Sequence, residues 1–293
     1  MFEKIYQRLI FTIILLICLS AVFPLLYVVS TSLVRESEFV AKNGFVLWPS
    51  HPTLAAYQRL FSMETFYNAF LISVARTIIG TVTMLTMTTV TAYVVSRREL
   101  PGQRIFMLMV LITILFNGGL IPTFLLLKDL KLINTFWVYI IPGVVDSWSV
   151  LVLRQFMLNL PQELEESALL DGCGELTLFS KIIIPLSMPA IAAIAMFAAV
   201  GHWNAWFDAL IYIDNGRLKT LQLIVRNMLV SNTMAGDIIG TNIGVVLNDP
   251  TRKMNEQTMK LALVVLSTIP ILMIYPFLQK YFVKGVYIGA IKE

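Results

Sequence analysis

Long hydrophobic stretches alternate with short polar ones along the whole chain. Residues 9–33 contain no charged side chain, and a helix of this length can cross a hydrocarbon core of about 30 Å. Five later stretches have a similar length and character. The predicted spans are residues 9–33, 66–95, 105–127, 132–158, 188–213 and 259–282. The pattern therefore predicts an all-α membrane protein with six transmembrane helices, in which residues 1–293 form a single transmembrane domain.

The composition supports this interpretation and argues against binding to nucleic acid. Of the 293 residues, 57% are hydrophobic and 14% are charged, and the mean hydropathy is +0.78. These values are more apolar than those of ordinary soluble proteins. The formal net charge of +4 and the pI near 9.0 come from basic residues scattered among loops and chain ends, as is typical of a membrane protein. We therefore expect a lipid bilayer around the chain and no nucleic-acid partner.

The orientation follows from the very short polar segment between the second and third spans. It contains Arg97, Arg98 and Arg104, and positive charge in short loops marks the cytoplasmic side. The longer outer loop at residues 214–258 is also basic, so the prediction depends on the short segment. With six spans, both termini are then cytoplasmic, including the tail at residues 283–293. We expect the first span to remain uncleaved, since no suitable cleavage site follows it.

Three of the predicted spans contain residues that interrupt or kink helices, and in the last span these are Pro270 and Pro276. The third span is broken at Asn117, which two glycines follow, and such breaks at membrane depth are tolerated only where protein or a water-filled cavity receives the freed backbone groups. The break therefore indicates a place beside a central pathway. The fourth span contains a Pro-Gly kink and then Asp146. For Asp146, a bond to a neighbouring helix is favoured over contact with a substrate.

The second and fifth spans contain the other polar side chains. Arg76 lies about two turns from the outer end of the second span, and a charge inside a span is a candidate for function. Two interpretations stay open: Arg76 snorkels or pairs with a structural partner, or it lines the pathway.

The fifth span has the densest group of polar and aromatic side chains, namely His202, Trp203, Asn204, Trp206 and Asp208. Tryptophan and asparagine can stack on the apolar faces of a sugar and bond its hydroxyl groups. In the alternative interpretation, the tryptophans belong to an aromatic belt at the membrane interface, and His202 pairs with Asp208. Both interpretations stay open, and Asn204 is the member that most favours contact with substrate.

Residues 161–186 form a charged segment between the fourth and fifth spans. Pro161 suits the first position of a helix, and three glutamates follow in its first turn, where carboxylates complement the helix dipole. Gly172 can take the left-handed conformation that ends such a helix. A second short helix is expected after it, until Pro185 ends that helix. Its apolar face is expected to consist of Leu176, Phe179, Ile182 and Ile183.

The same segment carries a pattern of fixed spacing, E-A-A-x-x-x-G followed later by I-x-L-P. The positions that fit it are Glu166, Ala168, Asp171, Gly172, Ile182 and Pro185, with Ser167 and Ile184 as conservative departures. In this the segment resembles the loop of ABC-importer permeases. The resemblance implies that it is a cytoplasmic coupling helix that docks in a groove of an ATPase subunit.

Three further stretches resemble the carbohydrate-uptake branch of that family. They are FNGGLIPTF at residues 116–124, GHWNAWFDAL at residues 201–210 and YPFLQKYFVKGVYIGAIKE at residues 275–293. The chain is similar to the second membrane subunit of maltose-type importers, and most of all to the polysaccharide subgroup that includes alginate importers. The resemblance implies a homologous second permease chain, two ATP-binding subunits and an extracytoplasmic solute-binding protein that contacts residues 231–248.

The sequence predicts no catalytic residues and no metal site on this chain. The phosphate-binding pattern G-x-x-x-x-G-K-[ST] is absent, so ATP and Mg²⁺ are expected on partner subunits. His51 and His202 are far apart in sequence and have no clustered cysteines beside them. No disulfide is expected between Cys18, inside a span, and Cys173, in the charged segment.

The sequence therefore predicts a permease subunit, in the bacterial cytoplasmic (inner) membrane, of an ATP-driven and binding-protein-dependent oligosaccharide importer. Alternating access would move the cargo, and an acidic polysaccharide such as alginate is the candidate. Two alternatives stay open. One is an integral-membrane enzyme that modifies a lipid or glycan, with Asp146, His202 and Asp208 as acid and base. The other is an ABC permease for a solute that is not a sugar.

Overall fold

The computed structural model describes residues 2–42, 44–97, 100–230 and 257–274, and these residues form helices and turns without a β-strand. The predicted all-α class is therefore confirmed for this part of the chain. The chain divides into two compact units, Met1–Tyr67 with Ile224–Pro270, and Asn68–Leu223 with Ile271–Glu293. The predicted contact of residues 231–248 with a binding protein and the predicted tail at residues 283–293 lie outside the described residues.

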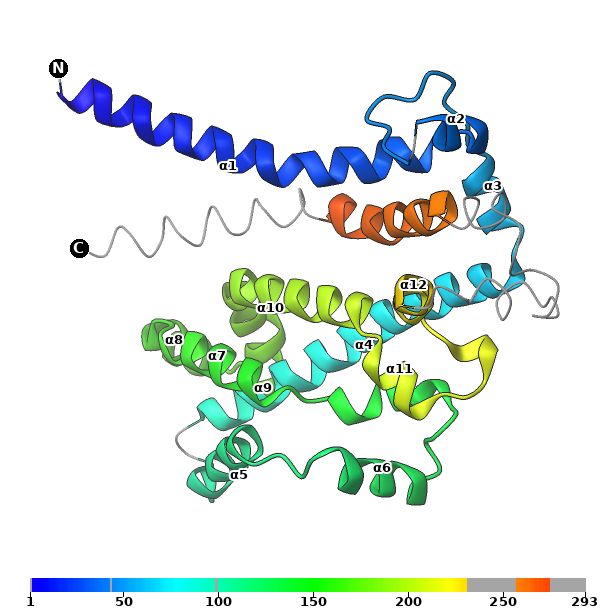
Figure 1. The fold of residues 1–293 in the computed structure, drawn as a ribbon. Coiled ribbons are helices and arrows are strands. Elements are labelled where there is room, and N and C mark those ends of the chain that lie inside the picture. The colour runs from blue at the N-terminus through cyan, green and yellow to red at the C-terminus, as the bar shows by residue number, and fades with distance from the viewer. Residues whose placement is uncertain (1, 43, 98–99, 231–256, 275–293) are drawn as a thin grey trace. The chain divides into compact units, whose positions relative to one another are not determined.

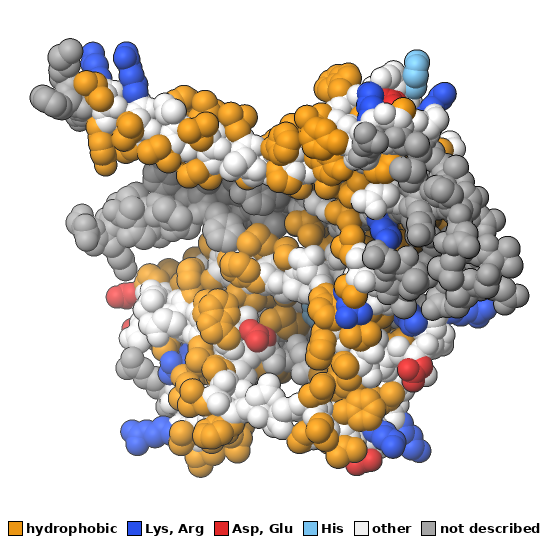
Figure 2. Space-filling view, viewed as in Figure 1, with side chains coloured by type: hydrophobic (Ala, Val, Ile, Leu, Met, Phe, Trp, Pro, Cys, Tyr) orange, Lys and Arg blue, Asp and Glu red, His pale blue; other side chains and the backbone are white. Residues whose placement is uncertain are grey.

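In the first unit, α1 (Phe2–Ser32) is followed by the short helices α2 (Glu36–Ala41) and α3 (Ala55–Phe61). Val34, Phe39 and Val46 form a small hydrophobic core beyond the end of α1. Figure 2 shows hydrophobic side chains along most of the visible face of α1, and the apolar window of this helix has no buried residue. Such a surface is stable only in contact with lipid or another apolar protein surface.

The second unit contains most of the helices (Figure 1). They are most of α4 (Glu64–Ser96), α5 (Gln103–Leu115), α6 (Leu120–Asp129), the 3₁₀-helices η1 (Phe136–Tyr139) and η2 (Ile141–Gly143), α7 (Ser147–Leu158), α8 (Gln162–Leu170), α9 (Glu175–Leu178), the π-helical turn η3 (Phe179–Ile183), α10 (Ile184–Asn204), α11 (Phe207–Tyr212) and the 3₁₀-helix η4 (Gly216–Leu218). The helix α12 (Leu221–Val230) begins in this unit, and its residues from Ile224 onward belong to the first unit.

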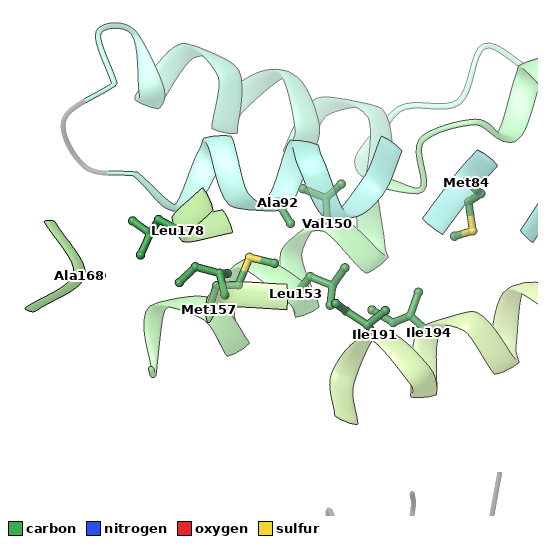
Figure 3. Packing of buried hydrophobic residues seen from close by; sticks show 10 residues of the cluster. Met84, Ala92, Val150, Leu153, Met157, Ala168, Leu178, Ile191 and Ile194 are labelled. Carbon is green, nitrogen blue, oxygen red and sulfur yellow. The ribbon is translucent and has the colours of Figure 1, made fainter. Parts of the chain in front are cut away.

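The larger core of this unit joins α4, α7 and α10 to the charged segment. Ala92 of α4, Leu153 of α7 and Ile191 of α10 are buried in one cluster, with Ala168 of α8 and Leu178 of α9 at its edge (Figure 3). Burying each large aliphatic side chain of this kind contributes roughly 1.5–3 kcal/mol. The charged segment is therefore packed onto the ends of the long helices.

Four helices of the described residues are long and apolar enough to cross a membrane, and two bent pairs raise this number to six if each pair is one span. α5 and α6 meet at 118°, and the pair formed by residues 136–143 and α7 meets at 45°. The first bend contains the interruption expected from the sequence. Gly119 there has φ +86° and ψ 174°, a conformation that is nearly restricted to glycine.

The structure corrects the prediction that Pro185 ends the second short helix of the charged segment. The helix instead runs without a break from Glu175 to Asn204. Proline has no N–H group and its ring collides with the carbonyl four residues before it. Here the π-helical turn Phe179–Ile183 comes directly before the proline, and the wider spacing of such a turn accommodates the missing bond.

The predicted apolar face of that helix is also wrong in one member. Ile183 is buried, and Phe179 and Ile182 pack against the core cluster. Leu176 is 83% exposed, and Leu178 is buried in its place. The π-helical turn shifts the residues that follow it around the helix axis, so a single helical period across residues 175–185 selects the wrong leucine.

Candidate functional site

Two groups of polar side chains lie near opposite ends of the long helix α4. The Arg76 cluster consists of Arg76, Tyr139, Ala205 and Asp208, and the Arg97 cluster consists of Tyr93, Arg97, Glu165 and Glu175. The two arginines are separated by about 30 Å of helix, at a rise of about 1.5 Å per residue. One helix thus connects a polar centre among the apolar spans with the charged segment.

Arg76 is held on several sides at once. Its Nη1 donates to Asp208 Oδ1 at 3.0 Å and to the carbonyl of Ala205 at 3.4 Å, and its Nη2 donates to the other oxygen of Asp208. Its guanidinium carbon lies 4.5 Å from the centre of the Tyr139 ring. Arg76 is 3% exposed, so it pairs with a structural partner and does not snorkel.

The break between α10 and α11 places Asp208 and Ala205 beside Arg76. Asp208 lies in the first turn of α11, where a carboxylate also complements the helix dipole. The carbonyl of Ala205 has no helical partner at this break, and the Arg76 guanidinium and the Thr220 hydroxyl donate to it at 3.4 and 3.5 Å. Tyr139 Oη donates to the carbonyl of Leu218 at 2.8 Å. These bonds hold the break in one geometry.

His202 packs against α4 at a glycine. A Cβ atom added to Gly80 would lie 2.6 Å from the imidazole ring of His202, which is too close for any side chain. Gly80 is therefore required for this close approach of α4 and α10. The predicted pairing of His202 with Asp208 is not found, because the Asp208 carboxylate bonds Arg76 instead.

The other aromatic and amide side chains of the fifth predicted span differ in accessibility. Trp203 is 5% exposed and meets Phe70 edge to face, with 6.1 Å between ring centres. Trp206 is half-buried and meets Phe207 at 5.7 Å in the same manner. Asn204 is exposed, and its Oδ1 accepts from Gln222 Nε2 at 3.4 Å. Asn204 is the one exposed member of this group.

The side chains of Asp146 and Asn117 each accept a hydrogen bond from a backbone N–H group close to them in sequence, near the start of the helix that follows. Asp146 caps α7, because its Oδ2 accepts from the backbone N–H of Ser149 at 2.8 Å. Asp146 also bonds the neighbouring helix α4, but through its backbone N–H, which donates to Thr88 Oγ1 at 3.2 Å, and not through its carboxylate. Asn117 Oδ1 accepts from the N–H of Gly119 at 2.9 Å within the break before α6.

The Arg97 cluster connects the end of α4 to both helices of the charged segment. Arg97 donates to Glu165 of α8 and to the hydroxyl of Tyr93, and its Nη2 lies 3.7 Å from Glu175 of α9. Tyr93 Oη bonds Glu175 Oε2 at 2.7 Å. Partial burial alone would lower the pKa of Arg97, but the hydrogen bonds that Arg97 donates to Tyr93 and Glu165 outweigh it, and the pKa is raised. Arg97 therefore stays charged.

The charged segment has one packed face and one uncovered face. Ala168 is buried against the core, whereas Glu166, Ser167, Asp171 and Pro185 are exposed. Ile182 is half-buried. Leu170 is 88% exposed, and with the exposed Leu176 it lies outside the core. An uncovered leucine pair among carboxylates is typical of a surface that docks on another protein.

Gly172 forms the bend between α8 and α9. Its φ is +78°, the left-handed region that costs other residues roughly 1–2 kcal/mol. The N–H of Gly172 donates to Leu169 and the N–H of Cys173 to Ala168, both at 3.0 Å. These bonds satisfy carbonyls at the end of α8, so the glycine predicted from the sequence determines the angle of the bend.

Tyr93, Tyr139 and Asn134 were missed by reasoning from the sequence. The two tyrosines lie in apolar stretches of the sequence. An aromatic residue in such a stretch is usually interpreted as part of the surface that faces the membrane. Asn134 has φ +64°, and its Oδ1 accepts from the N–H groups of Asp214 and Asn215 at 3.0 and 2.8 Å. The only feature of the sequence that indicated this role was an asparagine after a short loop, since asparagine tolerates a positive φ.

A family model described as "Binding-protein-dependent transport system inner membrane component" matches residues 90–287. The chain is 39% identical to the "Polygalacturonan/rhamnogalacturonan transport system permease protein YtcP" of Bacillus subtilis (strain 168), with 99% of each chain covered. It is also 39% identical to "Protein LplC" of the same organism, with 92% of this chain and 89% of the relative covered.

A solved structure supports the same likeness. The chain resembles a chain in the "Crystal structure of a bacterial ABC transporter involved in the import of the acidic polysaccharide alginate", with a TM-score of 0.83 and 26% identity. The likeness covers 96% of this chain and 97% of the other. It therefore extends over nearly all of the chain.

Proposed function

Because this chain belongs to the family of binding-protein-dependent transport system inner membrane components, we propose that it is one membrane subunit of an ATP-driven importer of acidic oligosaccharides. The family is one of transport components and not of enzymes. The positions of Asp146 and Asp208 agree with this, since each carboxylate already has a structural partner.

One observation carries the assignment of a separate motor: the uncovered face of the charged segment. α8 is attached to the core by Ala168, while Glu166, Leu170 and Leu176 remain exposed beside the bend at Gly172. We assign this face to an ATPase subunit. Glu166 and the exposed leucines would contact that subunit, and ATP and Mg²⁺ would bind there and not on this chain.

The proposal includes the arrangement of the chain in the membrane. Each bent pair of helices would count as one span, so that six spans cross the bilayer and both termini lie in the cytoplasm. The charged segment would then lie on the cytoplasmic side, between spans four and five. A homologous second permease chain, two ATPase subunits and an extracytoplasmic solute-binding protein would complete the transporter.

The proposed cargo rests on the relatives and not on a free positive charge in the described residues. Arg76 is neutralised by Asp208, so it does not offer its charge to an acidic sugar. Polygalacturonan and alginate, named for the relative and the solved structure, are both polymers of uronic acids. Asn204 and Trp206, at the break between α10 and α11, are the side chains that we assign to sugar contact.

Uptake by the reconstituted transporter tests this function. The chain is co-expressed with its second permease chain and ATPase subunit, and ATP-dependent uptake of uronic-acid oligosaccharides is measured in vesicles with the binding protein. We expect Leu170→Glu to release the ATPase subunit and abolish uptake, because a charge would enter the docking face. Leu54→Glu, at a leucine that is 60% exposed outside this face, should leave both unchanged.

Two results would contradict the proposal. One is an ATPase subunit that remains attached to the Leu170→Glu chain with normal uptake, since the docking face would then be elsewhere. The other is uptake of neutral oligosaccharides or of solutes that are not sugars, with no uptake of uronic-acid oligomers. That second result would leave the proposed docking face standing and would refute only the proposed cargo.

A further inference from the structure

We propose that Arg97 is a positioning residue that fixes the angle of the charged segment relative to α4, and thereby makes the segment and the long helices move as one body. The inference rests on the proposed function of that segment as the docking site of a motor. It concerns residues that lie behind the docking face and do not contact the motor.

The first argument is that α8 has few other attachments. Ala168 is the only residue of α8 that is buried, and Glu165 is the only other one that is not exposed. Glu165 owes its position to Arg97, which bonds it directly. One apolar contact and one ion pair therefore hold α8 against the core, and Arg97 provides the second of them.

The second argument is that Arg97 bridges the bend. It bonds Glu165 before Gly172 and, together with Tyr93, contacts Glu175 after it. The ring of Tyr93 also packs on Phe179, with 4.6 Å between ring centres. A glycine by itself gives the backbone more conformational freedom than any other residue. The contacts of Arg97 on both sides of the bend reduce that freedom.

The third argument is electrostatic. One guanidinium stands between two carboxylates, with side-chain exposures of 27% for Arg97 and 23% for Glu165. Partial burial strengthens the Arg97–Glu165 pair relative to a fully exposed pair, whereas the Glu175 side chain is 68% exposed. Without the positive charge, Glu165 and Glu175 would repel each other across the bend. Removing Arg97 should therefore open the angle actively and not merely loosen it.

The last argument concerns transmission along α4. The Arg76 cluster and the contact of His202 with Gly80 join α4 to α10 at a second place. α10 continues from α9 without a break. The Arg97 cluster therefore adds a joint between the charged segment and the end of α4, so that a force applied to the segment moves α4 together with the continuous helix from α9 to α10.

Cys173 provides a native reporter at the bend. It is partly buried against the core cluster, and the chain has only one other cysteine, Cys18. In a Cys18→Ala background, the full-length chain in inside-out membrane vesicles is treated with a membrane-impermeant thiol reagent. We expect Arg97→Met to increase the rate of Cys173 labelling about fivefold, the effect of losing one partly exposed ion pair.

Two sets of variants separate positioning from general damage. Arg104→Met removes an exposed arginine from the same short polar segment and should change the labelling rate less than twofold. Glu165→Gln with Glu175→Gln, added to Arg97→Met, should return the rate toward that of the parent chain, because the repulsion is gone. Equal labelling of the Arg97→Met and Arg104→Met chains would overturn the proposal.

The assembled transporter gives a second readout. We expect Arg97→Met to keep the ATPase subunit attached and hydrolysing ATP, but to reduce the sugar imported per ATP about tenfold. A purely structural role would lower the amount of assembled complex and leave that ratio unchanged, which would refute the inference. Should the parent complex import no sugar, the proposed function fails, while the labelling of Cys173 still tests the role of Arg97.

Discussion

Arg76 in α4 and Arg97, the residue directly after α4, make ion pairs of opposite kinds. Arg76 is almost fully buried and gives its guanidinium to one carboxylate, that of Asp208. Arg97 is partly exposed and is shared by Glu165, Glu175 and the hydroxyl of Tyr93. A buried pair cannot open without leaving a charge in an apolar environment, whereas a partly hydrated pair can separate into water at little cost.

This difference in burial indicates that the two clusters have different structural roles. The Arg76 cluster is a permanent joint that maintains the break between α10 and α11. The Arg97 cluster is a weaker joint next to an exposed docking face, and its strength can change when a partner binds.

The largest effect is expected from Arg76→Met. It leaves the Asp208 carboxylate, whose side chain is 27% exposed, without its cation. Breaking a fully buried pair costs about 3–5 kcal/mol, and the partial exposure of Asp208 places the expected cost at the lower end, about 3 kcal/mol. We expect a large loss of folded chain, measured by thermal unfolding in detergent. Arg76→Met with Asp208→Leu should recover most of that stability, because no charge is left unpaired. A single variant as stable as the parent chain would show that this joint is not permanent.

Gly80→Ala should cause the next largest effect. The added methyl group would meet the His202 ring at 2.6 Å, and overpacking of this kind costs about 1–3 kcal/mol. Gly201→Ala is the matched control, since nothing lies within 4 Å of an added Cβ there and its φ is not positive. Adding His202→Ala to Gly80→Ala should remove the penalty, and additive losses in the unfolding temperature would contradict the close contact.

Gly172→Ala tests the bend beside the weaker joint. At φ +78°, alanine should cost about 1–2 kcal/mol, and the changed angle should reduce attachment of the ATPase subunit. Gly174→Ala, at a glycine with open space and no positive φ, should be neutral. Normal attachment and uptake in the Gly172→Ala chain would mean that the angle of the bend is not needed for docking.

Arg97→Met should lower the free energy of unfolding by at most about 1 kcal/mol, as for other partly exposed pairs. The loss should shrink further in 1 M salt, where screening weakens the parent pair too. The stability lost in Arg76→Met should instead be nearly independent of salt. A similar salt dependence for the two variants would remove the distinction between the joints.

The smallest effect is expected at Glu38, which forms an ion pair with Lys42 outside the two arginine clusters. The Lys42 ammonium, together with the backbone N–H of Ser50, lowers the pKa of Glu38 from 4.5 to about 2. A lowered pKa stabilises the fold above pH 4.5, and this contribution disappears as the pH falls toward 2. The Ser50 amide resonance should follow that titration in the parent chain, and Glu38→Gln should abolish it.

The fold class was predictable because hydrophobic length alone requires helices in a bilayer. The break after Asn117 and the bend at Gly172 were also predictable, since glycine marks backbone conformations that other residues avoid. The partner of Arg76 could not be predicted from the sequence. Asp208 is 132 positions away in sequence, and no periodic pattern specifies which of several polar residues in distant spans will meet.

The charged segment shows the same limit at shorter range. Its glutamates were interpreted as complements of a helix dipole, and this is correct for Glu163 and Glu165, which lie in the first turn of α8, whereas Glu166 lies beyond that turn. The tertiary partner of Glu165 is Arg97, directly after the end of α4, and this arginine was interpreted only as a signal of orientation. A pattern that explains a residue completely at the local level gives no indication that the residue has a second role.

The π-helical turn at Phe179–Ile183 has a consequence for the evolution of such chains. Such a turn accommodates one residue more than the regular helix, and one residue corresponds to about 100° of rotation. Deleting Ser180 would turn every later side chain of α10 around its axis relative to the charged segment. The cargo-facing side of the helix could thus be exchanged by a single codon deletion, while the surface offered to the motor stays the same.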